Sequence, residues 1–185
     1  DGIGEAAFEE SFDEMRPEHG LSARHRLLLE VAALLHEVGG YVSSRAHHKH
    51  SYYLLANAEI FGLRRDEVEI VAQAARYHRR SPPRSTHVPY VSLTRENRML
   101  VTKLAALLRV ADALERGHAQ QVRDIQFVRG RDELTLRVGG VADLALERRA
   151  LAQKADMFED VFGMRIRLEE APLQPLRPGA GPTET

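Results

Sequence analysis

Apolar residues along the first two thirds of the chain recur every three or four positions, the spacing of one face of an α-helix. The clearest such face consists of Leu27, Val31, Leu34 and Val38. Ser22 precedes this stripe as an N-cap, and the Gly39-Gly40 pair ends it. We therefore predict a helix between Ser22 and Gly39, with His36 and Glu37 at its C-terminal end.

Three further segments carry the same helical pattern. They span residues 48–57, 66–80 and 94–117. Asp66 and Glu67 stand in the first turn of the second segment, where carboxylates oppose the positive end of the helix dipole. The segment 81–89 contains three prolines and is predicted to be a loop.

After residue 120 the period changes from helical to alternating. Apolar and polar residues alternate over 125–128, 134–138 and 164–168, which predicts three strands, and a helical stripe lies between the second and third of them. The chain is therefore expected to be mainly α. A helical domain over residues 1–120 precedes a small α+β lobe over 121–170, in the order strand, strand, helix, strand. A Pro/Gly-rich tail over 171–185 is expected to be disordered.

Composition limits the classes of function. Of the 185 residues 29% are charged, yet the net charge is −1 at pH 7, so no global field attracts nucleic acid or an anionic membrane. Any affinity for phosphate must then come from a local cluster. The chain has no cysteine, which excludes disulfides and thiolate metal sites. No apolar run approaches the roughly 20 residues that span a bilayer, and we expect a cytoplasmic location without membrane partners.

Candidate metal ligands are spread along the predicted helices in a recognisable order. They are His36, Glu37, His50, His78 and Asp112. Imidazole and carboxylate together suit divalent Mn, Mg, Fe or Zn. The order resembles the HD metal-phosphohydrolase superfamily, in which a His-Asp pair, two further histidines and a late Asp hold one or two metal ions. Glu37 stands where that pattern has Asp, and its extra methylene moves the carboxylate by about 1.5 Å. The resemblance implies an HD-domain-like helical bundle followed by the small α+β lobe.

Each candidate ligand also has an ordinary structural explanation. An inward histidine is often only a hydrogen-bonded core residue, and Asp112 could pair with Arg109 or Arg116 on its own helix. His47 or His48 could replace His50 as a ligand. His25 is excluded as a ligand, because eleven residues of helix place it roughly 16 Å from His36.

A basic cluster flanks two of the proposed ligands. It consists of Lys49, Arg76, Arg79 and Arg80, with Arg84 nearby. Guanidinium groups fit phosphate oxygens, so we predict that these residues bind phosphate. The alternative is a solvated helix end favoured by the helix dipole.

Four segments in order resemble the C-terminal region of the exopolyphosphatase/guanosine pentaphosphate phosphatase family. They are residues 32–39, 47–51, 76–80 and 107–114, and the resemblance covers about residues 8–170. In that family an N-terminal pair of actin-like domains carries out hydrolysis, with glycine-rich phosphate loops and a catalytic Glu. Nothing in this chain matches those loops, so no catalytic residue is assigned. The resemblance implies an HD-like accessory half that forms part of a basic path for polyphosphate and makes dimer contacts.

The leading prediction is therefore an accessory region of an exopolyphosphatase-related protein. It would bind polyphosphate, a phosphorylated nucleotide or a partner domain. The expected partners are actin-like phosphatase domains, in the same or a separate chain, and a second copy in a homodimer. The alternative is a self-sufficient HD-type metal-dependent phosphohydrolase that acts on a phosphoester or phosphoanhydride. A pure dimerisation module is a third hypothesis, because it needs only the apolar faces.

Overall fold

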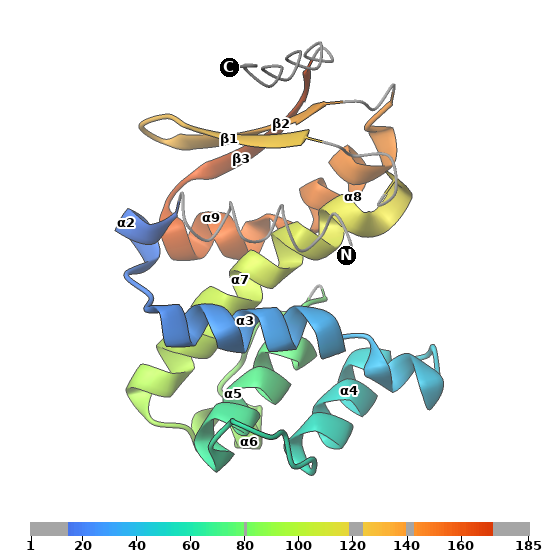
Figure 1. Ribbon diagram of the computed structural model, residues 1–185, viewed down its shortest axis with the longest axis vertical. Helices are drawn as coiled ribbons and strands as arrows, with labels where there is room; N and C mark the ends of the chain where they lie inside the picture. The colour runs from blue at the N-terminus through green and yellow to red at the C-terminus, as the bar shows by residue number, and fades with distance from the viewer. Residues whose placement is uncertain (1–14, 80, 119–123, 140–142, 172–185) are drawn as a thin grey trace, which may run out of the picture.

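Helix α7 (Arg95–His118) is the element on which both parts of the chain pack (Figure 1). Helices α3 (Ala23–Leu35) and α5 (Arg65–Arg76) contact it from the N-terminal part, and α8 (Ala145–Lys154) and α9 (Asp156–Phe162) contact it from the C-terminal part. The computed structural model describes residues 15–79, 81–118, 124–139 and 143–171.

Local sequence signals explain where the helices begin. Helix α3 follows Ser22, whose Oγ accepts a hydrogen bond from the His25 N–H (3.4 Å). The Nδ1 of His25 accepts one from the Ser22 N–H in return (3.2 Å), so this histidine completes the cap of its own helix. Helices α4 (His47–Ala56) and α7 agree with the predicted ranges to within about one residue, and a short 3₁₀ helix, η1 (Val38–Tyr41), lies between α3 and α4.

Several segments differ from the prediction. Helix α3 ends at Leu35, and the Gly39-Gly40 pair lies within η1 rather than at the end of the helix. Helix α5 ends at Arg76, so His78 lies just beyond the helix rather than on its apolar stripe. A short helix, α6 (Val88–Val91), occupies part of the segment that was predicted to be a loop. Its proline stands in the first turn, where the missing N–H has no helical partner to lose. Pro17 has the same position in α2 (Arg16–His19).

The C-terminal part contains a three-stranded sheet in the order β1-β2-β3. Strand β1 (Asp124–Arg129) is antiparallel to β2 (Glu133–Gly139), and β2 is parallel to β3 (Arg165–Ala171). A parallel pair needs a crossover, which α8 and α9 supply. The single helix predicted here is therefore two short helices that meet at Ala155. The prediction of a mainly α fold with a small α+β part is confirmed.

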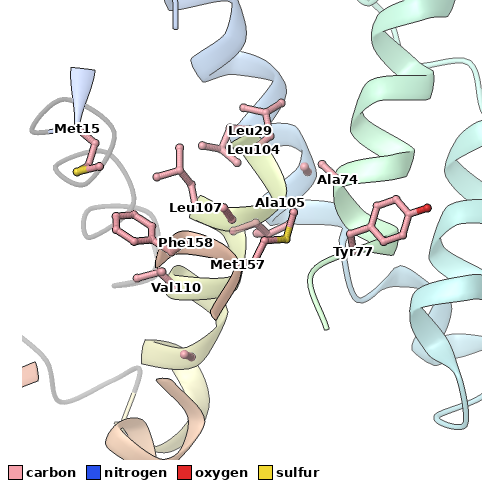
Figure 2. Packing of buried hydrophobic residues seen from close by; sticks show 14 of the residues in the cluster. Met15, Leu29, Ala74, Tyr77, Leu104, Ala105, Leu107, Val110, Met157 and Phe158 are labelled. Atoms are coloured by element: carbon pink, nitrogen blue, oxygen red, sulfur yellow. The ribbon is translucent and has the colours of Figure 1, made fainter. Parts of the chain in front are cut away.

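One cluster of buried apolar residues runs through both parts (Figure 2). It joins Leu29 of α3 and Ala74 of α5 to Leu104 and Leu107 of α7, and continues to Phe158 of α9. The apolar stripes of these helices thus face one shared core. No helix in the described part of the chain is long and apolar enough to span a bilayer. The division at residue 120 and the HD-like relation remain predictions, and the predicted tail lies almost wholly outside the described residues.

Candidate functional site

Three of the predicted ligands meet in the interior. His36, His78 and Asp112 each offer one ligand atom, and these atoms lie within 4.8 Å of one another. All three side chains are buried. His36 is the C-cap of α3, His78 follows the end of α5, and Asp112 lies on α7. Helix packing therefore brings together residues up to 76 positions apart in the sequence.

Backbone carbonyls orient both buried histidines. The Nδ1 of His36 lies 2.6 Å from the Ala33 carbonyl oxygen, and the Nδ1 of His78 lies 2.5 Å from the Ala75 oxygen. A ring nitrogen at this distance from a carbonyl is the donor, so Nδ1 of each ring carries a proton and Nε2 is the ring nitrogen left to face the cluster. Accordingly His36 Nε2 lies 4.0 Å from Asp112 Oδ1. The two rings pack edge to face with centroids 4.8 Å apart.

A third histidine, His47 at the start of α4, contacts His78. Its Nε2 lies 3.1 Å from the Nε2 of His78, and the two rings are stacked. Burial lowers the pKa of His78 to about 2, and neighbouring positive charge acts in the same direction. His78 is therefore neutral, and its Nε2 accepts the hydrogen bond that His47 donates.

The remaining partner of Asp112 is a lysine from α8. The Lys154 ammonium forms an ion pair with Asp112 Oδ2, and only 6% of Lys154 is exposed. Burial lowers the pKa of Lys154 to about 8, Arg109 and Arg79 act in the same direction, and Glu37 opposes them. The side chain thus remains mostly charged at pH 7.

The donor types in this cluster suit a divalent ion, but their present arrangement does not fit one. Two imidazoles and a carboxylate at this spacing are a common metal-binding set. The carboxylate that would bind the ion is, however, already paired with the Lys154 ammonium. A divalent cation beside that ammonium would meet a like charge in a buried site.

The other predicted ligands lie elsewhere. Among the described residues, neither Glu37 nor His50 belongs to the convergent group, and Glu37 is exposed. Of the alternatives left open for His50, His47 is the one that reaches His78. Arg109 does not pair with Asp112. The Arg116 side chain is outside the described part of the structure.

Lys154 was not recognised from the sequence, although its position carried a signal. It stands three residues after Leu151 and four before Phe158, on the stripe of the apolar residues of that segment. All three of these residues are buried. A lysine on an apolar stripe requires a buried anion, because burial of an unpaired ammonium costs several kcal/mol.

A basic pocket of about 310 Å³ opens beside the cluster. It is lined by His48, Lys49, Arg76, Tyr77, Arg79, Ser81, Arg84 and His87. Three of the predicted phosphate-binding residues, Lys49, Arg76 and Arg79, thus share one pocket, together with Arg84. The fourth, Arg80, lies outside the described residues. None of these lining residues is acidic.

The positive charge of this pocket comes from its arginines and Lys49, and not from His48. The Arg76 guanidinium lies over the ring of Tyr52, 5.1 Å from its centroid, which restricts its motion. Burial lowers the pKa of His48 to about 4, and the positive charges of Arg79, His47, Lys49 and Arg76 lower it further. His48 is therefore neutral at pH 7, and its buried Nδ1 has no hydrogen-bond partner. Such a pocket favours an anion over a cation.

Comparison with known proteins identifies the family of this chain. Residues 6–156 match the family described as Ppx/GppA phosphatase, domain III. The chain is also 32% identical over 84 residues to a guanosine-5'-triphosphate,3'-diphosphate pyrophosphatase of Pseudoalteromonas translucida (strain TAC 125). That match covers 45% of this chain but 16% of the relative. A third domain implies others in the full-length members of the family. The chain belongs to the Ppx/GppA phosphatase family, in which it corresponds to domain III.

Proposed function

We propose that this domain is an accessory region that binds polyphosphate, or the phosphate groups of a nucleotide, for catalytic domains of its family. The observation that carries the proposal is the basic pocket, whose described lining contains four cationic side chains and no carboxylate. The net charge of the whole chain is −1, so this concentration of positive charge is local.

The chemistry of the lining suits a chain of phosphates. Arginines supply planar forks of N–H donors, Lys49 supplies a point charge, and Ser81 and Tyr77 add polar atoms. These groups come from α4, from the end of α5 and from the segment before α6. A ligand that contacts all three elements must be extended or carry several anionic groups, as polyphosphate does.

Hydrolysis is assigned to other domains, as the earlier resemblance to the family implies. We infer that actin-like phosphatase domains, in the same chain or in a partner chain, contact this region and receive the phosphate chain from it. The rival hypothesis is a self-sufficient metal-dependent phosphohydrolase. The convergence of His36, His78 and Asp112 favours it, and the ammonium of Lys154 on Asp112 opposes it.

Binding of long-chain polyphosphate, measured by isothermal titration calorimetry, tests the proposal. Lys49→Gln and Arg79→Gln each remove one charge from the pocket, and Arg149→Gln removes one from an exposed position on α8. A charge-assisted hydrogen bond contributes about 1.5–3 kcal/mol, so each pocket variant should bind roughly 10- to 100-fold more weakly than wild type. Arg149→Gln should bind about as well as wild type.

Salt and a second polyanion complete the test. Wild-type affinity should fall between about 50 and about 300 mM salt, because these charges are partly exposed and are screened. Poly-aspartate of similar charge should bind more weakly than polyphosphate, since its carboxylates are spaced differently. Equal affinity of the pocket variants and Arg149→Gln would refute the proposal, as would the lack of any binding at low salt.

A further inference from the structure

A lysine stands where the two buried histidines and Asp112 leave room for a cation. The Lys154 ammonium pairs with Asp112 Oδ2, and both side chains are buried. The same carboxylate presents Oδ1 to His36 Nε2 at 4.0 Å, and His78 lies within the same group. Lys154 therefore occupies one of the directions in which a metal ion would approach the carboxylate.

We infer that the Lys154 ammonium replaces a divalent metal ion as the resident cation of this cluster. Removal of its charge should then convert the cluster into a metal site. The inference rests on geometry: two buried imidazoles whose Nδ1 atoms are held by backbone carbonyls, and a buried carboxylate whose cation comes from the chain itself. The ligand atoms of His36, His78 and Asp112 already lie within 4.8 Å of one another, and His78 Nε2 would exchange its contact with His47 for the ion.

The charges around the cluster support this assignment. Arg109 is fully buried, and together with Arg79 it acts electrostatically on Lys154. Arg109 donates from Nε to the Tyr77 carbonyl (2.8 Å) and from Nη1 to Asp156 Oδ1 (3.0 Å), so it stays in place. The negative charge of Glu37 acts on Lys154 in the opposite direction, and the Glu37 side chain is exposed. The positive charges of Arg109 and Arg79, added to that of the ammonium, make the surroundings unfavourable for a further divalent ion while Lys154 is present.

The replacement also gives the cluster a mechanical role. Asp112 belongs to α7 and Lys154 to the last turn of α8, so the ion pair fastens the C-terminal part to the helical part, as a structural metal ion would. If the domain binds polyphosphate as proposed above, a tethered ammonium has one further advantage. Phosphate oxygens are strong ligands for hard divalent ions and could extract a bound metal, whereas they cannot extract a side chain.

Titration with Co(II), followed by its visible absorption, tests the inference without any phosphate ligand. Its result is therefore independent of the polyphosphate proposal. We expect wild type to bind no Co(II) at this cluster. Lys154→Met keeps most of the apolar stem and removes the charge, and it should bind one Co(II) per chain, roughly 100-fold or more tightly than wild type. Lys103→Met, on α7, is the matched control and should behave as wild type.

Two double variants locate the gained site. Lys154→Met/His78→Gln and Lys154→Met/Asp112→Asn should each lose the Co(II) band, since each removes a proposed ligand. Lys154→Met leaves Asp112 buried without a cation, so this variant can unfold in the absence of metal. In that event, recovery of the helical circular dichroism signal on addition of Co(II) supports the inference.

Three results would overturn it. One is stoichiometric Co(II) binding by wild type that is lost in His78→Gln. The second is a folded Lys154→Met chain that binds no Co(II). The third is a Lys154→Met chain that stays unfolded even in the presence of the metal.

Discussion

Glu67 should make the domain sensitive to acid. This carboxylate stands in the first turn of α5 and accepts two hydrogen bonds from Arg24 of α3, from Nε (2.8 Å) and from Nη2 (2.7 Å). It also accepts the N–H of Arg64 (2.8 Å), which completes the cap of α5. Only 5% of the Glu67 side chain is exposed. One carboxylate therefore caps a helix and joins two of the helices that contact α7.

The magnitude follows from the pKa of Glu67. Hydrogen bonds from Arg24 lower it from 4.5 to about 2, burial opposes this shift, and the Arg64 N–H adds to it. The full shift corresponds to about 3 kcal/mol. Arg24 is 44% exposed, so solvent screening reduces the contribution, and we expect about 1.5–3 kcal/mol. Because the folded-state pKa is the lower one, this stability is present above pH 4.5 and is lost as the pH falls toward 2.

Urea unfolding of wild type and Glu67→Gln at about pH 6.5 and about pH 3.5 measures the effect. At the higher pH the variant should be less stable by about 1.5–3 kcal/mol, and at the lower pH the difference should shrink by about 1 kcal/mol. Glu59→Gln, which alters an exposed carboxylate, is the control and should show neither effect. A difference that is the same at both pH values would refute the linkage, and equal stability at pH 6.5 would refute the contribution itself.

Three further predictions concern packing and activity. Gly39→Ala should destabilise the fold by about 1–3 kcal/mol in urea unfolding, because the added Cβ would overlap the backbone of α4; an unchanged unfolding midpoint would contradict the close approach. Asp156→Asn should lower the free energy of unfolding by about 1–2 kcal/mol in the same assay, because the fully buried Arg109 loses its carboxylate partner. The loss should be smaller than for a fully buried ion pair, since the Asp156 side chain is 60% exposed. The isolated chain should hydrolyse polyphosphate and guanosine pentaphosphate negligibly, with or without Mn or Mg. Robust phosphate release that is abolished by His36→Ala and Asp112→Ala would favour the metal-dependent phosphohydrolase instead.

The sequence by itself determined most of the secondary structure, because those signals are local. Ser22 marked the start of α3 through its cap hydrogen bond, and the change from helical to alternating period marked the sheet. The Gly39-Gly40 pair does not end α3, which stops at Leu35, because both glycines lie within η1. Helix boundaries were predicted less well where two local signals conflicted. Pro89 read as a breaker and lies in the first turn of α6, and the stripe from Val68 to His78 continued past the end of α5.

The order of His36, His78 and Asp112 along the chain was enough to nominate them, but only packing decided which histidine of α4 would join them. Ser51 Oγ donates to the His36 carbonyl (2.6 Å) and accepts the Gly39 N–H (2.9 Å), which fixes the rotation of α4. His47 lies four residues before Ser51 and therefore on its face, whereas His50 is adjacent and points about 100° away. Helical periodicity shows which face is buried, but not which of several histidines meets another helix.

Lys154 and the basic pocket depended still more on tertiary structure. The apolar residues around Lys154 in the sequence indicated that it is buried. They did not indicate its partner, because Asp112 lies 42 positions away in the chain. The pocket takes Lys49 from α4 and Arg84 from beyond α5, residues whose side chains meet only after the helices pack. Sequence determines the charge that each position carries. Whether two charges share a site depends on distances through space, and those are set by the core that lies between the helices.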